Sequence, residues 1–333
     1  MQPGHTIMSN LLSAAEDVFF YADAAVADRA KRMWGDTVRS SHWFVREGMA
    51  KDLREVERIW RWLHEEGATR QSLLVCAGGG TVTDLGGFAA ATFKRGIRYI
   101  NIPTTLLAMV DASAGGKTGF DFDGVKNEIG SFYPPLDTII DPSWLETLPY
   151  EEFLSGYAEM VKHALIADKN EYVRLVSSEP EEDIESKIQA SIRIKKNVVE
   201  QDPHESGWRK VLNFGHTVGH AVEAHSKHNQ RPLRHGYAVM QGMVAELYIS
   251  VVEKGLDREV LRQMSHYLIE LYGRPYCGCS DYDSLLALMR SDKKNDRYGD
   301  ITFTLLTDIG QPVINQVIPD ARIKESLDYL FSL

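Results

Sequence analysis

The chain has 333 residues, of which 44% are hydrophobic and 25% are charged, ordinary values for a protein with a buried core and room for two domains. Its formal net charge of −10 argues against general binding to nucleic acid. No apolar run reaches the roughly 18–20 residues needed to cross a bilayer, and residues 1–10 lack the basic and apolar segments of a secretory signal. We therefore expect a cytoplasmic protein whose partner is a small molecule, with neither a membrane nor a nucleic acid involved.

Strands and helices alternate in the first part of the chain. The run at residues 73–77 (Leu-Leu-Val-Cys-Ala) is typical of a buried parallel strand, and it leads directly into three glycines and a helix. The expected strands cover residues 18–25, with an end at Asp23, 73–77, 99–102 and 138–140, and the expected helices cover residues 50–65 and 83–92. This order predicts an α/β domain with a mainly parallel, Rossmann-like sheet over residues 1–147.

The pattern changes near residue 148, after which most of the chain has helical periodicity. The expected helices cover residues 151–167, 183–200, 211–225, 235–253, 257–271, 282–291 and 320–331. A hairpin interrupts them, with strands at residues 301–306 and 313–318 joined by a turn at 308–310. We therefore predict an α/β domain followed by a mostly α-helical domain over residues 148–333.

The three cysteines, Cys76, Cys277 and Cys279, form no disulfide framework, which agrees with a cytoplasmic setting. Cys277 and Cys279 are too closely spaced for the usual zinc-binding pair, and the sequence offers no matching second pair. We interpret them as structural.

Gly78, Gly79 and Gly80 lie between a buried strand and a helix. Glycines let the backbone approach a pyrophosphate, and the N–H groups at a helix start favour an anion, so this turn is a candidate dinucleotide site. The pattern is not GxGxxG, and a simple tight turn is the alternative interpretation. A second segment, from Asp111 to Thr118, ends like a P-loop but lacks the required earlier glycine, which argues against a nucleoside triphosphatase.

Polar residues follow one stripe on each of two otherwise apolar predicted helices. The first stripe holds Glu159, Lys162 and His163, and the second holds Asn213, His216 and His220, with His235 at the start of the next helix. A catalytic zinc site commonly has two histidines and one carboxylate with open positions, so Glu159, His216 and His235 are the predicted ligands. The alternative is that His216 and His220 are hydrogen-bonded core histidines.

Basic residues are concentrated near these motifs although the chain as a whole is acidic. They are Lys94, Arg95, Lys117, Lys126, Lys162, Lys195, Arg209, Lys293 and Lys294. Local cations in an acidic protein suit a small anionic substrate better than a polyanion, whereas solvated surface charge is the alternative for any one of them.

Six ordered segments between about residues 77 and 306 resemble the dehydroquinate synthase family of sugar-phosphate cyclases. They are GGGTVTDLGGFAAATFKRG, IPTTLLAMVDASAGGKTGFD, GVKNEIGSFYPP, LPYEEFLSGYAEMVKH, NFGHTVGHAVE and HGYAVMQGM. The sequence departs from the family in three features. The family's opening hairpin has no counterpart here, and the family motif Gly-Glu-x-x-Lys is matched only by the different order Glu-Gly-Met-Ala-Lys from Glu47 to Lys51. The family motif His-Gly-Glu is replaced by His235-Gly236-Tyr237.

The resemblance implies that the first domain binds NAD and that the second binds metal and substrate. The implied NAD residues are Asp23, Glu47, Lys51, Gly79, Gly80, Thr81, Asp84, Thr104, Thr105, Lys126 and Thr147, and the implied zinc or cobalt ligands are Glu159, His216 and His235. The implied substrate residues are Asp111, Lys117, Asn127, Lys162, Lys195, Arg209, Asn213 and His220, with Lys293 or Lys294. Arg95 matches an arginine that, in the family, reaches the substrate phosphate of the neighbouring subunit, which implies a homodimer.

The implied activity is a phosphate-eliminating carbon–oxygen lyase reaction of the shikimate pathway, in which 3-deoxy-D-arabino-heptulosonate 7-phosphate becomes 3-dehydroquinate and phosphate. NAD would oxidise the substrate transiently and be regenerated, and an internal aldol closure would form the ring. Three alternatives stay open: another sugar-phosphate cyclase, an iron-type NAD-dependent alcohol dehydrogenase, and a non-catalytic nucleotide-binding protein that retains the fold.

Overall fold

The computed structural model describes residues 12, 17–35, 40–48, 50–112, 115–275, 277–291 and 300–333. The chain forms two compact units, Met1–Leu148 and Pro149–Leu333. Among the described residues, none of the helices combines the length and the apolar character that spanning a membrane requires.

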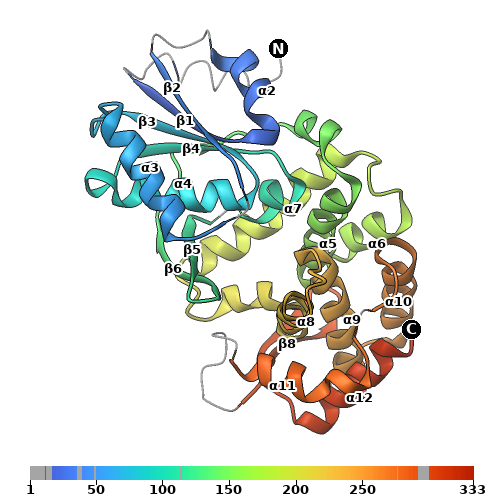
Figure 1. Ribbon diagram of the computed structural model, residues 1–333. Coiled ribbons are helices and arrows are strands. Elements are labelled where there is room, and N and C mark those ends of the chain that lie inside the picture. The colour runs from blue at the N-terminus through green and yellow to red at the C-terminus, as the bar shows by residue number, and fades with distance from the viewer. Residues whose placement is uncertain are drawn as a thin grey trace. The chain divides into compact units, whose positions relative to one another are not determined.

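Unit 1 is built on a parallel sheet with the strand order β2-β1-β3-β4-β7 (Figure 1). The strands are β1 (Val18–Asp23), β2 (Ser41–Arg46), β3 (Leu73–Gly78), β4 (Arg98–Pro103) and β7 (Asp137–Thr138). Every residue of β3 is buried, as expected for a central strand that is covered on both faces. The predicted α/β fold with a parallel sheet is therefore confirmed.

Helices cover both faces of this sheet. They are α2 (Ala24–Trp34), α3 (Leu53–Glu65) and α4 (Gly80–Thr92). The chain reverses its direction across the sheet after β2, and parallel crossovers are right-handed, so α2 lies on the face opposite α3 and α4 (Figure 1). Accordingly Phe19 and Tyr21 of β1 pack in one core with residues of α3 and α4, while Phe20 points the other way.

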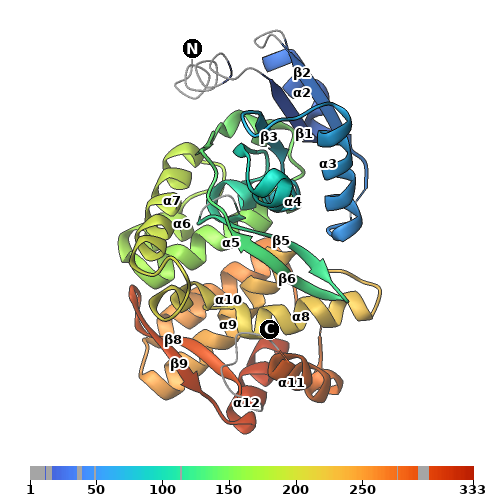
Figure 2. The ribbon, with the colours of Figure 1, turned by 90° about the vertical axis from the view of Figure 1, so that its left-hand side faces the viewer.

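A hairpin of β5 (Lys117–Phe122) and β6 (Val125–Phe132) packs beside α4 (Figure 2). Gly87 of α4 permits this approach, because a Cβ atom there would lie 2.5 Å from Cγ2 of Thr118. Short helical turns complete the unit: η2 (Phe93–Arg95), the π-helical η3 (Ala108–Ala112) and η4 (Pro142–Thr147). The hairpin is absent from the sequence-based prediction because most of β6 is exposed and shows no apolar alternation.

Unit 2 is mostly helical, as predicted, and α9 (His235–Lys254) is its central helix. The other elements are α5 (Tyr150–Ala167), α6 (Lys169–Ser177), α7 (Ile184–Gln201), η5 (Trp208–Asn213), α8 (His216–His228), α10 (Arg258–Tyr272), η6 (Cys279–Asp281), α11 (Tyr282–Ser291), the hairpin β8 (Thr302–Asp308) and β9 (Gln311–Val317), and α12 (Asp320–Phe331). Helix α9 is apolar around most of its circumference because it packs against α5, α8, α10, α12 and β8.

Several predicted boundaries are wrong. The predicted helix 211–225 begins only at His216, because Gly215 has a left-handed φ of +78° and separates it from η5. Asn213 therefore does not share the helical face of His216 and His220. Helix α4 begins at Gly80, before the predicted residue 83, since packing overrides the low helix propensity of glycine. The strand expected at 138–140 is the two-residue β7, whereas the predicted end of the first strand at Asp23 is confirmed.

Candidate active site

Glu159 of α5, His216 of α8 and His235 of α9 converge within unit 2. Oε1 of Glu159 lies 3.4 Å from Nε2 of His216 and 3.5 Å from Nε2 of His235, and the Glu159 side chain is completely buried. Tetrahedral ligands with bonds of about 2.1 Å stand about 3.4 Å apart, which is the spacing found here. The three predicted ligands thus place two nitrogen atoms and one oxygen atom around a common point.

Hydrogen bonds on the far side of each imidazole orient these donor atoms. Nδ1 of His216 lies 3.1 Å from the carbonyl oxygen of Phe214, and Nδ1 of His235 lies 3.1 Å from Oε2 of Glu223. When Nδ1 donates to these acceptors, the lone pair of Nε2 faces Glu159, which is the tautomer that a metal ligand needs. Sequence reasoning missed Glu223, although its position three residues after His220 continues the same polar stripe.

The donor set fits a divalent ion of the zinc or cobalt class, because two imidazoles and one carboxylate are common ligands for such ions. The negative charge around His235 also suits a bound cation. Burial lowers the pKa of His235, but its interactions with Glu159 and Glu223 outweigh burial and raise that pKa to about 9. The two carboxylates therefore favour a positive charge at this position, either a proton or a metal ion.

Lys162 and His220 border this cluster. The ammonium group of Lys162 forms an ion pair with Oε2 of Glu159, and only 1% of Lys162 is exposed. The ring of His220 lies 5.2 Å from that of His216 and 6.0 Å from that of His235. His163, on the same predicted stripe as Lys162, instead contacts Oγ of Ser191 at 2.7 Å, so we assign it to the packing of α5 against α7.

Glu246 of α9 holds the first turn of α8 and was also missed by sequence reasoning. Its fully buried carboxylate accepts hydrogen bonds from the backbone N–H groups of Gly215 at 2.7 Å, Thr217 at 3.1 Å and Val218 at 3.4 Å. These are N–H groups that a helix start leaves without intrahelical acceptors, and the helix dipole adds to the attraction. Glu246 thereby fixes the backbone that carries His216.

Two further predicted substrate residues are buried in unit 2: Lys195 of α7 is 5% exposed and Arg209 of η5 is 2% exposed. Both elements pack against α5, the helix that carries Glu159. Asn213, at the end of η5, is half-buried.

The loop before η5 is built around Asp202. Its carboxylate accepts backbone N–H groups from Ser206 at 2.9 Å, Gly207 at 2.8 Å and Arg209 at 3.0 Å. These bonds hold the pKa of Asp202 well below its ordinary value. The Arg209 guanidinium also donates to the carbonyl oxygen of Pro203 at 2.8 Å, so the loop fixes both the backbone and the side chain of Arg209.

The glycine turn of unit 1 lies at the carboxyl ends of β3 and β4. Thr104 donates its N–H to the carbonyl oxygen of Gly78 at 2.9 Å, and a Cβ atom on Gly79 would lie 3.2 Å from Cγ2 of Thr105. Gly79 precedes α4 and carries no side chain to cap it, so the first N–H groups of α4, including those of Gly80 and Thr81, can serve an anion. The structure thus groups five of the predicted NAD residues.

Lys51 joins two other predicted residues. Its ammonium group lies 2.6 Å from Oδ2 of Asp84 on α4 and contacts Oδ1 of Asn127 on β6. The backbone N–H of Asp121 donates to the carbonyl oxygen of Lys51 at 2.7 Å, which ties the segment before α3 to the hairpin. Lys51 therefore connects the glycine-turn helix with the hairpin, while Glu47 is exposed just after β2.

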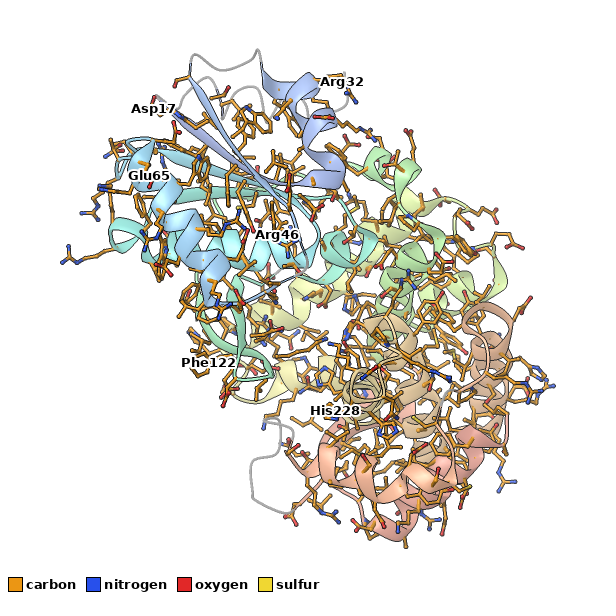
Figure 3. The ribbon with its side chains drawn as sticks, viewed as in Figure 1. Asp17, Arg32, Arg46, Glu65, Phe122 and His228 are labelled. Atoms are coloured by element: carbon orange, nitrogen blue, oxygen red, sulfur yellow. The ribbon has the colours of Figure 1, made fainter. Side chains whose placement is uncertain are left out.

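Asp23 stands at the carboxyl end of β1, on the same sheet edge as the glycine turn. It caps α2 by accepting the N–H of Ala25 at 3.1 Å, and it lies 3.3 Å from the guanidinium of Arg46 (labelled in Figure 3). Arg46, at the end of β2, is 4% exposed and was not recognised in the sequence. Its burial beside Asp23 fixes the orientation of that carboxylate.

The remaining predicted residues are dispersed. Arg95, Lys117, Lys126 and Thr147 are exposed, and Asp111 in η3 is half-buried. Arg95 and its neighbour Lys94 both have left-handed backbones, with φ of 65° and 49°. Lys293 and Lys294 lie outside the described residues.

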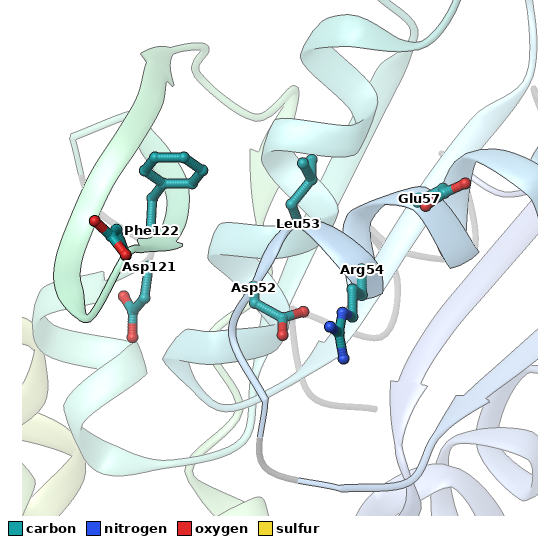
Figure 4. A pocket seen from close by; sticks show the side chains of 7 residues that line it. Asp52, Leu53, Arg54, Glu57, Asp121 and Phe122 are labelled. Carbon is teal, nitrogen blue, oxygen red and sulfur yellow. The ribbon is translucent and has the colours of Figure 1, made fainter.

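A hollow of about 390 Å³ lies between the start of α3 and the tip of the hairpin (Figure 4). It is lined by Asp52, Leu53, Arg54, Glu57, Asp121, Phe122 and Asp123. Leu53 and Phe122 project toward this space from the two elements, and each is nearly half exposed. The hollow contains none of the predicted cofactor residues, and most of the residues that line it are charged.

The fold is shared with solved structures of two kinds of enzyme. It is similar to 2-deoxy-scyllo-inosose synthase complexed with carbaglucose-6-phosphate, NAD+ and Co2+, with a TM-score of 0.85 and 23% identity over 97% of this chain and 94% of that chain. It is also similar to 2-epi-5-epi-valiolone synthase from Streptomyces hygroscopicus with NAD+ and Zn2+ bound, with a TM-score of 0.83 and 24% identity over 96% of this chain and 92% of that chain. It is less similar to sulfoacetaldehyde reductase from Bifidobacterium kashiwanohense in complex with NAD+ (0.70, 15%, 100% and 96%). The fold therefore defines a structural class that contains both synthases and reductases.

Sequence comparison identifies the family within this structural class to which the chain belongs. Residues 43–155 match the family model 3-dehydroquinate synthase N-terminal, and residues 156–295 match 3-dehydroquinate synthase C-terminal. The chain is 50% identical over 285 residues to 3-dehydroquinate synthase of Parabacteroides distasonis (84% of this chain, 80% of the relative) and 40% identical over 289 residues to that of Streptococcus pyogenes serotype M18 (85% and 80%). The chain belongs to the 3-dehydroquinate synthase family.

Proposed function

We propose that the protein converts 3-deoxy-D-arabino-heptulosonate 7-phosphate into 3-dehydroquinate and phosphate, a step of the shikimate pathway that leads to chorismate and the aromatic amino acids. The observation that carries this proposal is the 50% identity to a 3-dehydroquinate synthase over 84% of the chain. The cluster of Glu159, His216 and His235 supports it, because this chemistry needs a metal ion on the substrate hydroxyls.

The two cofactors fall on different units. Unit 1 is the proposed NAD-binding domain, with the glycine turn, Asp23 and Lys51 among its cofactor residues, and unit 2 is the proposed metal- and substrate-binding domain. When bound, the zinc or cobalt ion supplies Lewis-acid polarisation of the substrate hydroxyls, and NAD supplies a hydride acceptor that returns the hydride. NAD is thus needed only in catalytic amount.

Buried cations of unit 2 bind the substrate in this proposal. Lys162, Lys195 and Arg209 come from three elements that pack together, and all three are at most 5% exposed. Clustered cations attract anions and donate charge-assisted hydrogen bonds to them, so a substrate with both a phosphate and a carboxylate suits this set. Lys117, Asn127 and Asp111 of unit 1, and Lys293 or Lys294, are proposed to complete the substrate contacts.

His220 is the proposed proton relay. Its ring lies 5.2 Å from the ring of His216, one of the residues that would hold the metal ion. A neutral imidazole accepts a proton near pH 7, which is the step that hydride removal from the same carbon requires. His220 therefore serves the chemistry without serving as a ligand.

We further propose a cytoplasmic homodimer in which Arg95 reaches the substrate phosphate of the partner subunit. The exposed position of Arg95 in a left-handed turn supports this role. Large apolar side chains are also exposed on unit 1, namely Leu53, Phe122, Val125, Phe132 and Leu136. Exposed apolar groups of this size are typical of a surface that another chain covers.

A comparison of three sugar phosphates tests the substrate assignment. We expect kcat/KM to be highest for the heptulosonate 7-phosphate, because its carboxylate offers the cluster of cations a second anionic group, which sedoheptulose 7-phosphate and glucose 6-phosphate lack. The assay is run at saturating NAD and zinc. Faster turnover of either carboxylate-free sugar would leave the family unchanged but would reassign the substrate.

A further inference from the structure

A second cluster of metal-binding side chains lies at the other end of α8 from His216. It consists of His225 near the end of that helix, Cys277 in the turn before η6, and Asp281 at the end of η6. His225 and Cys277 are each 7% exposed, and the side chain of Asp281 is 26% exposed. One nitrogen, one sulfur and one oxygen therefore gather at a site that is mostly withdrawn from water.

The nitrogen–oxygen spacing in this cluster is close to that of the first cluster. Nε2 of His225 lies 3.3 Å from Oδ1 of Asp281, compared with 3.4 and 3.5 Å between Glu159 and its two histidines. The Cys277 sulfur belongs to the same group, whose ligand atoms all lie within 4.8 Å of one another. The separation between His225 and Asp281 is the one expected of two tetrahedral ligands of one ion.

The groups around His225 and Asp281 orient their donor atoms. Nδ1 of His225 is 3.2 Å from Oγ of Ser284, and when Nδ1 donates to this oxygen, Nε2 has a lone pair for an ion. Oδ2 of Asp281 accepts the N–H of Gly278 at 2.9 Å, so Oδ1 is the oxygen that faces His225. The Asn229 amide also lies 2.9 Å from Nε2, and this exposed side chain can turn its oxygen toward an ion.

We propose that His225, Cys277 and Asp281 bind a second divalent ion of the zinc class, distinct from the ion of the active site. A thiolate with an imidazole favours zinc or cobalt over magnesium or calcium. The sequence alone pointed away from this site, because Cys277 and Cys279 lack a second cysteine pair, whereas the other ligands come from α8 and η6. The ion would tie the end of α8 to the segment that leads into α11.

Cobalt titration of the metal-free, full-length chain without NAD tests this inference. A thiolate bound to cobalt gives a charge-transfer absorption in the near ultraviolet, and the first cluster contains no sulfur to produce it. We expect the wild-type chain to bind two cobalt ions and to show this absorption. The test does not depend on the reaction, so its outcome is separate from that of the proposed function.

Variants assign the two ions. Cys277→Ser should lose the absorption and one ion, whereas Cys279→Ser, the matched control in the same turn, should keep both. His216→Ala should lose the other ion and keep the absorption. If Cys277→Ser fails to fold, this variant still shows that the absorption comes from an ion outside the first cluster. A wild-type chain that binds a single ion without the absorption, or an absorption that disappears with Cys279→Ser, would overturn the proposal.

Discussion

Glu246 places a buried carboxylate beneath the helix turn that carries His216. Three backbone N–H groups converge on it, and none of them comes from its own helix. A signal was present in the sequence, since Glu246 is an acidic residue within the apolar segment 235–253. The sequence does not reveal its partners, because α8 and α9 meet only through tertiary packing.

We expect Glu246→Gln to weaken metal binding by roughly 10- to 100-fold, the usual effect of removing a group that orients a metal ligand. An amide offers one oxygen to three N–H donors and turns its own NH2 group toward them, so the first turn of α8 should shift. The measurement is competition for zinc with a chromophoric chelator. Glu253→Gln is the matched control, because Glu253 lies on the same helix but is exposed and pairs with Arg322. Equal zinc affinity in both variants would contradict this role.

His216 and His220 should differ in what they support. We expect His216→Ala to lose the active-site metal and all activity, because it removes one of the three proposed ligands. His220→Ala should retain the metal and lose about 10²- to 10⁴-fold in kcat, the range for a general acid–base residue. Elemental analysis and steady-state rates provide the measurement. Loss of metal from His220→Ala would make that residue a ligand.

At the level of elements, the loop of residues 202–209 positions Arg209 through Asp202. Backbone N–H donors hold the pKa of Asp202 below its ordinary value of 3.8. A carboxylate with a lowered folded-state pKa stabilises the fold above the unfolded-state pKa, and this contribution is lost as the pH falls toward the folded-state pKa.

We therefore expect Asp202→Asn to be less stable than the wild type by a constant amount from neutral pH to about pH 5, with the difference shrinking below pH 4. Urea unfolding at several pH values measures this. The same variant should raise KM for the sugar phosphate and leave metal affinity unchanged, because Arg209 loses its anchor. Asp257→Asn, which removes an exposed carboxylate but keeps an oxygen to cap α10, is the control. An unchanged KM would show that the loop does not position Arg209.

The elements show where sequence reasoning succeeds and where it fails. Long periodic helices such as α5 and α9 were predicted because burial imposes a regular apolar pattern. The β5–β6 hairpin escaped because its strands are mostly exposed, and the start of α8 was misplaced because the turn at Gly215 leaves no mark in the apolar pattern. The proposed metal ligands could be selected by residue type, whereas Glu223, Asp202 and Glu246 act through contacts that only the fold creates.

At the scale of the whole molecule, the proposed dimer makes a specific prediction about mixed variants. Arg95→Ala and His216→Ala should each be inactive as homodimers. If Arg95 serves the partner's site, subunit exchange between the two variants should restore partial activity, because one site per mixed dimer then has both residues. Failure of mixed dimers to recover activity would place Arg95 in its own subunit's site or outside any site.

The proposed reaction has no net redox change, and this separates it from the reductases that share the fold. The most direct measurement supplies the heptulosonate 7-phosphate in large excess over NAD and follows phosphate release and NADH absorbance together. The account predicts that phosphate and 3-dehydroquinate accumulate far beyond the amount of NAD while the absorbance stays flat. Phosphate release that stops when the NAD is spent, or NADH that grows in step with product, would contradict it.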